Sequence, residues 1–126
     1  MSVDPRDDLV NRDAAAEALR TLVTALGECG DQLVEARRRA EQLLAQRETG
    51  RSWLEIVSAE ERPLVVERIS SVMGTLATAG GAWRREQAHA LQAEQVSINR
   101  IAALYGVTRQ RISALLRERP AEPTGA

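Results

Sequence analysis

Apolar residues recur along most of this chain at alternating spacings of three and four, the pattern of amphipathic helices. The first such stretch begins near Asp13, and its apolar stripe consists of Leu19, Leu22, Val23 and Leu26. Gly27 and Gly30 predict a turn or kink, after which Asp31 can cap a second helix. Gly50 is a C-terminal stop signal, so we expect the second helix to end at about residue 49.

The next stretch opens with Ser52-Trp53-Leu54-Glu55, which has the Ser-x-x-Glu form of a capping box and predicts a short helix through Val57. Ser58-Ala59-Glu60-Glu61 repeats this form, and Pro63 suits the first turn of the helix that follows. We expect that helix over about residues 62–79, and Gly80-Gly81 is expected to end or bend it.

One side of this helix carries apolar residues spaced by four, three and four: Val65, Ile69, Val72 and Leu76. The alternation is a short heptad seam, as in helices that pack along one another. It supports two interpretations. The seam is either the interface of a homodimer or the face with which an amphipathic helix packs inside its own subunit.

The pattern is sharpest after a further helix expected over residues 82–94. Ser97 is a good N-cap for the next helix. Ile101 is a core position of that helix, and Ala102 is small enough for two helices to cross closely there. Gly106 can supply the left-handed backbone that a tight interhelical turn needs, and Val107 fills the turn. These features predict two short helices joined by a tight turn.

The second helix of this pair starts after Thr108, its expected N-cap, and is anchored from beneath by Ile112, Leu115 and Leu116. The opposite face then carries Thr108, Arg109, Gln110, Ser113, Ala114 and Arg117. Arg can pair with guanine, Gln with adenine, and Ser with a base edge or a phosphate, while a small Ala lets the helix sit deep in a groove. This face therefore suits a reader of the major groove.

Further basic and polar residues surround that face. Arg84 and Arg85 open the helix expected over 82–94, and Arg100 lies on the first helix of the pair, so all three are candidates for phosphate contacts. Arg111 is either a phosphate contact or a surface charge. The candidate DNA-binding set is completed by Ser97 at the start of the pair.

The segment Trp83–Arg119 resembles the bacterial helix-turn-helix family, in particular the homeodomain-like three-helix variant at the C-terminus of resolvases and in many small regulators. The resemblance is carried by Trp83-Arg84-Arg85-Glu86, the small Ala102, Gly106-Val107 and the run from Thr108 to Ser113. It implies that Thr108–Arg117 is a recognition helix and that the partner is double-stranded DNA. It does not extend to residues 1–81, where a resolvase catalytic domain could not fit.

Composition argues against catalysis and against a metal site. Cys29 and His89 are the only residues of their types, so a disulfide within the chain is impossible and a zinc site of the usual ligands is disfavoured. A Ser-His-Asp triad could form only around His89, in a helical context without a nucleophile motif. We expect a protein that is not an enzyme and that needs no cofactor.

The charges divide along the chain. Residues 1–81 carry ten Arg against fourteen Asp plus Glu, a balance of −4, whereas residues 82–119 carry seven Arg against three Glu, a balance of +4. All basic residues are Arg and none is Lys, which is typical of high-GC bacterial genomes. An acidic N-terminal part and a basic C-terminal part suit a region that meets protein partners and a region that meets nucleic acid.

These observations predict an all-α protein with a flexible N-terminus (1–12), a helical dimerisation region (13–81), a helix-turn-helix module (82–119) and a disordered tail (120–126). No apolar run is long enough to span a bilayer and the acidic start is unlike a signal peptide, so we expect a cytoplasmic protein at the nucleoid. The expected function is that of a homodimeric transcription regulator or nucleoid-associated protein. The alternative is a protein-interaction module, such as an adaptor that docks on RNA polymerase or an antitoxin-like partner.

Overall fold

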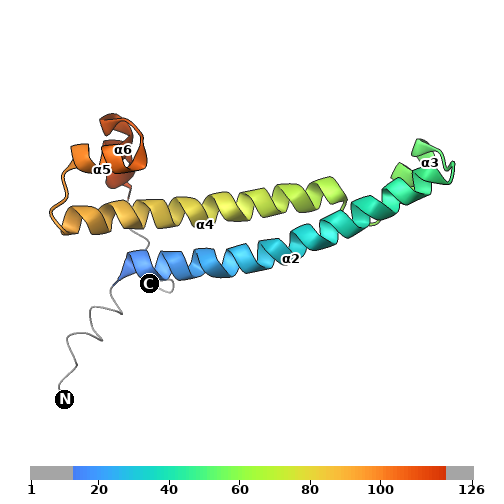
Figure 1. The fold of residues 1–126 in the computed structure, drawn as a ribbon, viewed down its shortest axis with the longest axis horizontal. Coiled ribbons are helices and arrows are strands. Elements are labelled where there is room, and N and C mark those ends of the chain that lie inside the picture. The colour runs from blue at the N-terminus through green and yellow to red at the C-terminus, as the bar shows by residue number, and fades with distance from the viewer. Residues whose placement is uncertain (1–12, 119–126) are drawn as a thin grey trace, which may run out of the picture. The chain divides into compact units, whose positions relative to one another are not determined.

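The computed structural model describes residues 13–118, and every regular element in that range is a helix. The helices are α2 (Ala14–Glu48), α3 (Trp53–Ala59), α4 (Val65–Ala93), α5 (Ile98–Tyr105) and α6 (Arg109–Arg117) (Figure 1). The predicted all-α class is thus confirmed for the described part. The predictions for residues 1–12 and 120–126 lie outside it. None of the described helices is both long and apolar enough to cross a membrane.

The chain forms two compact units. One takes in Met1–Val23 and Thr78–Ala126, of which residues 13–23 and 78–118 are described, and the other is Thr24–Ala77. The helices α2 and α4 each contribute residues to both units. The predicted boundary between residues 81 and 82 therefore falls inside α4.

Neither pair of glycines ends a helix. Gly27 and Gly30 lie inside α2, which is continuous, so Asp31 is an interior residue of that helix and not its N-cap. Gly80 and Gly81 lie inside α4 in the same way. An interior glycine costs a helix about 1 kcal/mol relative to alanine, which long helices of this kind tolerate because most of their stability comes from packing of one face.

The predicted stop at Gly50 and the cap at Ser52 are confirmed. Gly50 has a φ of +93° directly after α2, where the amide of Arg51 donates to the carbonyl of Gln46 at 3.3 Å. The Ser52 hydroxyl accepts the amide of Glu55 at 3.2 Å and so starts α3. The second predicted capping box is wrong, because Ser58 lies within α3, which runs two residues beyond Val57.

The start of α4 is instead capped by an acidic side chain. The Glu60 carboxylate accepts the amide of Val65 at 2.8 Å, and Glu67 accepts the amide of Leu64 at 3.3 Å. Pro63 lies just before the helix and not in its first turn. Carboxylates at a helix N-terminus are favoured because they satisfy free amides and face the positive end of the helix dipole.

In the unit Thr24–Ala77, α2 and α4 run antiparallel. The Cys29 thiol lies 3.9 Å from the carbonyl oxygen of Val72, and the Arg68 guanidinium donates to the side chain of Gln32. As the residue number increases along α2, the number of the facing residue in α4 thus decreases. The side chains buried between the helices are small, namely Ala25, Cys29, Ala36 and Val72.

This packing divides the seam predicted on α4. Val72 is 5 % exposed and packs inside the chain, as one of the two interpretations expected. Ile69 is 39 % exposed and Val65 and Leu76 are half-buried. Only part of the seam is therefore turned inward.

Candidate nucleic-acid interface

The end of α4 packs with α5 and α6 around a small apolar core. Its centre consists of Ala88, Ile101, Ala102 and Ile112, and Ile101 and Ile112 are completely buried. Around it lie the partly buried side chains Leu91, Val96, Ile98, Tyr105, Val107, Leu115 and Leu116. The predicted core positions Ile101 and Ile112 are confirmed by this burial, and the small Ala102 is also buried.

A turn at Gln95 joins α4 to α5. The amides of Gln95 and Val96 donate to the carbonyls of Gln92 and Leu91, each at 3.0 Å, which is the Schellman arrangement of a helix C-terminus. Gln95 occupies its left-handed position with a φ of +69°, where glycine is the usual residue. The end expected for this helix, at residue 94, is one residue beyond the observed end at Ala93, although an ordinary glutamine stands where a stop residue is usual. Ser97 caps α5, as predicted, by accepting the amide of Arg100 at 3.1 Å.

The turn between α5 and α6 is of the same type, but with glycine at the left-handed position. Gly106 has φ +67° and ψ +34°, and the amide of Val107 donates to the carbonyl of Ala102 at 3.1 Å. Thr108 then caps α6 by accepting the amide of Arg111 at 3.1 Å. Each of these roles was predicted from the residue types, and each is confirmed.

The helix α6 is sharply two-sided. Ile112 is fully buried and Leu115 and Leu116 are half-buried against the core. The opposite side exposes Thr108, Arg109, Gln110, Ala114 and Arg117, with Ser113 half-buried at its edge. Arg111 is also exposed, although its backbone amide is held by the cap. The predicted face is thus presented to solvent as a group.

Arg84 and Arg85, the candidate phosphate contacts on α4, are engaged within the chain. The Arg84 guanidinium lies 4.4 Å from the centre of the Tyr105 ring and 3.4 Å from that residue's carbonyl oxygen. Arg85 is half-buried and pairs with Glu118 at 3.2 Å and with Glu86 at 3.7 Å. These two arginines therefore fix the ends of α5 and α6 against α4, a role that sequence reasoning missed.

His89 belongs to the same joint. Its Nε2 lies 3.0 Å from the carbonyl oxygen of Glu118, the residue that ends α6. The spacing of Arg85 and His89 by four places both side chains on one face of α4, and this spacing was the available signal. Nothing in the sequence showed that Glu118 would lie opposite them.

The surface of the α5–α6 pair is basic. Between residues 97 and 118 it carries Arg100, Arg109, Arg111 and Arg117 against Glu118, a balance of +3. All four arginines are exposed. Glu118 is already paired with Arg85, so its charge is partly neutralised within the chain.

Tyr105, the last residue of α5, contacts Arg84 of α4 in two ways. Its hydroxyl donates to the carbonyl of Arg84 at 3.4 Å, while the Arg84 guanidinium covers its ring. Burial raises the pKa of Tyr105 above its ordinary value, and the nearby Arg84 charge opposes that rise. The phenol therefore stays neutral and keeps its hydrogen bond through the physiological range.

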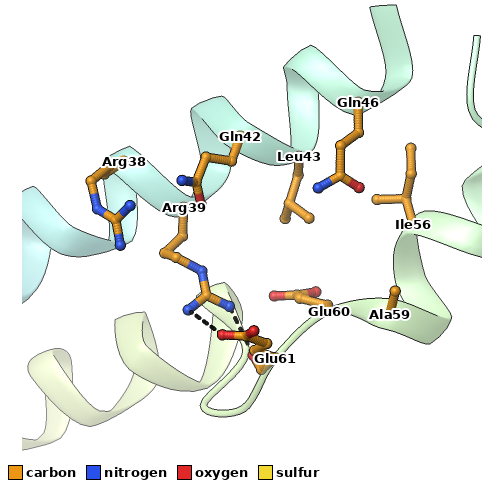
Figure 2. Close-up of a pocket in the computed structure, with 9 residues that line it drawn as sticks. All are labelled: Arg38, Arg39, Gln42, Leu43, Gln46, Ile56, Ala59, Glu60 and Glu61. Atoms are coloured by element: carbon orange, nitrogen blue, oxygen red, sulfur yellow. Dashed lines mark hydrogen bonds and ion pairs between the residues drawn. The ribbon is translucent and has the colours of Figure 1, made fainter. Parts of the chain in front are cut away.

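The other unit contains a hollow. It has a volume of about 320 Å³ and lies between α2, α3 and the segment before α4 (Figure 2). Arg39 points across it to Glu61, donating to its carbonyl oxygen at 3.1 Å and pairing with its carboxylate at 3.7 Å. Arg38 is paired with Glu35. Because both of its cations already have carboxylate partners, the hollow serves as a structural joint.

No family model, no curated protein and no solved structure was found to match this chain.

Proposed function

We propose that this chain is a small bacterial DNA-binding protein, a transcription regulator or a nucleoid-associated protein, that binds duplex DNA as a homodimer. In this proposal α5 and α6 form a helix-turn-helix with the end of α4, and α6 is the recognition helix. The observation that carries the proposal is the exposed face of α6, which presents Arg109, Gln110 and Arg117 while Ile112 is fully buried beneath.

The dimensions and chemistry of that face support the proposal. An α-helix with its side chains is about 10–12 Å wide, and the major groove of B-DNA is about 12 Å wide. Arg109 and Gln110 lie in the first turn of α6, the part of a recognition helix that approaches base edges. Arg and Gln are the side chains that pair best with guanine and adenine there.

Phosphate contacts are assigned to the arginines that are not engaged within the chain. Arg100 on α5 and Arg111 on α6 are both exposed. Arg85 instead acts as a positioning residue, because its guanidinium is held by Glu118 and Glu86. Arg84 is exposed but covers Tyr105, so its first role is also to hold α5.

The small size of the reader supports a homodimer. One such module buries only about 600–1,000 Å² on DNA, and readers of this kind usually act in pairs on adjacent half-sites. The remaining helical part of the chain is long enough to join two copies.

The test is a gel shift on pooled genomic DNA fragments at low salt, with wild type and the variant Arg109→Ala/Gln110→Ala. We expect wild type to shift a subset of fragments, and the variant to lose that preference, because each good base contact contributes about 1–3 kcal/mol. The matched control is Arg38→Ala/Gln42→Ala, which removes the same two side-chain types from α2. The control should behave as wild type.

Three results would contradict parts of the proposal. Absence of any shift by wild type at low salt would overturn DNA binding and favour a protein-interaction module. Equal preference in wild type and in the α6 variant would remove the recognition role from α6. A specific-to-nonspecific ratio below about tenfold would exclude a site-specific regulator and leave the nucleoid-associated role, since specific binders show about 10³ or more.

A further inference from the structure

The unit Thr24–Ala77 exposes a second apolar face besides the one that joins its two helices. On α2 the inward positions recur at spacings of four and three and include Ala25, Cys29, Ala36 and Leu43. A second series is obtained by moving each inward position one residue toward the C-terminus. Its apolar members and glycine are Leu26, Gly30, Leu33, Ala40 and Leu44. Every member of this second series is exposed.

The same offset occurs on α4. Its inward series contains Val65 and Val72, and the series one position further along comprises Val66, Ile69, Met73 and Leu76. Val66, Ile69 and Met73 are exposed, by as much as 66 % for Met73, and Leu76 is half-buried. The inward series of each helix contains polar members, among them Gln32 and Arg68, which hydrogen-bond to each other, whereas the outer series of α4 is entirely apolar.

The two outer stripes lie on one side of the helix pair. In the heptad notation abcdefg with the inward residues at a and d, the outer residues occupy b and e. Because the two helices are antiparallel, the twofold relation between them places the e positions of both helices on the same side. The outer face, as we call the two exposed series together, is therefore one surface two helices wide.

We propose that a second copy of this chain covers the outer face, so that two helix pairs form a four-helix bundle. This inference rests on the proposed function, which requires a homodimer, and it names the surface through which that homodimer forms. The outer face repeats the spacing by which α2 and α4 already pack, so it is complementary to another face of the same kind. A twofold axis brings together two identical faces, and no other partner is needed to cover them.

The size of the outer face fits this occupant. At 1.5 Å per residue, Val65–Ala77 is about 20 Å long and Thr24–Glu48 about 37 Å long. With helix axes about 9 Å apart and each helix about 10 Å wide, the face covers about 500 Å² in each copy. Two copies then bury about 1,000 Å², the area at which specific interfaces begin.

Gly30 leaves room for a close approach to the backbone at the outer face. It lies within the outer face, inside a continuous helix, and apart from its chain neighbours and the helix's own nearby backbone no atom lies within 4 Å of the place where a Cβ would be added. Alanine is the better helix former and would fit in the single chain, so nothing inside the chain requires glycine there. A second helix that approaches the backbone closely at this point would fit against glycine better than against alanine. Arg37, also on this stripe, keeps its charge in water beside Glu41.

The test is sedimentation equilibrium of the full chain without DNA. We expect wild type to be a dimer at micromolar concentration. Leu33→Gln/Ile69→Gln should raise the dissociation constant at least about a hundredfold, because four apolar side chains per dimer lose their burial. The control Leu54→Gln changes a residue of α3 that is 78 % exposed and off the outer face, and it should remain a dimer. Circular dichroism checks that all variants keep their helix content.

A second pair of variants keeps the test decisive if the double variant fails to fold. Gly30→Ala should raise the dissociation constant about tenfold, whereas Gly74→Ala, on the far side of α4, should change it less than about twofold. A monomeric wild type, a dimer that survives Leu33→Gln/Ile69→Gln, or dissociation caused by Leu54→Gln would each overturn the proposed interface. Failure of DNA binding with an intact, outer-face-dependent dimer would overturn the function instead and leave the interface standing.

Discussion

Replacing Gly106 or Gly74 by alanine should change the stability of the protein in opposite directions, although the surroundings of the two glycines are equally open. Apart from the adjoining backbone and the chain neighbours, no heavy atom lies within 4 Å of the place where either would carry a Cβ, so alanine at these positions meets no clash with the rest of the chain. Gly106 has a φ of +67° in the turn between α5 and α6, whereas Gly74 lies in the interior of α4. The backbone conformation alone therefore decides the effect of each substitution.

Gly106→Ala should destabilise the protein by about 1–2 kcal/mol, the cost of placing an L-residue in the left-handed region. Gly74→Ala should stabilise it by about 0.5–1 kcal/mol, because alanine loses less backbone entropy in a helix. The expected difference between the two variants is then about 1.5–3 kcal/mol. Since each site lies away from the outer face, dimer formation should not alter the comparison.

Urea denaturation followed by circular dichroism measures both changes, provided that all samples have the same protein concentration. Gly106→Ala should lower the midpoint and Gly74→Ala should raise it, with little change in the slope. Equal shifts in the two variants, or a stabilising effect of Gly106→Ala, would refute the assignment of Gly106 to a left-handed turn. The positions of α5 and α6 relative to each other depend on that turn.

Two further substitutions test the unit that contains α5 and α6. Because burial raises the pKa of Tyr105, its neutral phenol contributes stability that is fully present below about pH 10, the unfolded value, and is lost as the pH rises through the higher folded value. Above pH 10 the free energy of unfolding of Tyr105→Phe should therefore fall less steeply with pH than that of wild type. Identical pH dependence in the two proteins would contradict this role of Tyr105. Thr108→Ala should cost about 1 kcal/mol through loss of the cap on α6. Thr108→Ser should restore most of that loss in the same urea assay, and a Ser variant as unstable as the Ala variant would count against capping.

Local chemistry made much of the C-terminal unit predictable. Ser97, Gly106 and Thr108 each have a residue type that satisfies a particular backbone need, and each performs it in the structure. The alternation of Ile101 and Ile112 with exposed polar residues likewise predicted which side of each helix is buried. Such signals act within a few residues, so they survive without knowledge of the rest of the chain.

The missed features depend on tertiary packing. Gly27 and Gly80 looked like breaks because glycine disfavours helices locally, yet packing along α2 and α4 outweighs a cost of about 1 kcal/mol at each site. The heptad seam on α4 could not be divided into inward and outward residues until its partner helix was placed. The joint between Arg85, His89 and Glu118 joins residues about thirty apart in sequence, and no local pattern encodes that approach.

The most direct test of DNA recognition by α6 is a backbone amide NMR titration of the full chain with the duplex selected in the gel shift. We expect the largest chemical-shift changes at residues 108–117, with smaller ones near Ser97 and Arg100, and little change in Thr24–Ala77. Changes concentrated in Thr24–Ala77 with residues 108–117 unaffected would contradict the assignment of α6 as the helix that meets DNA.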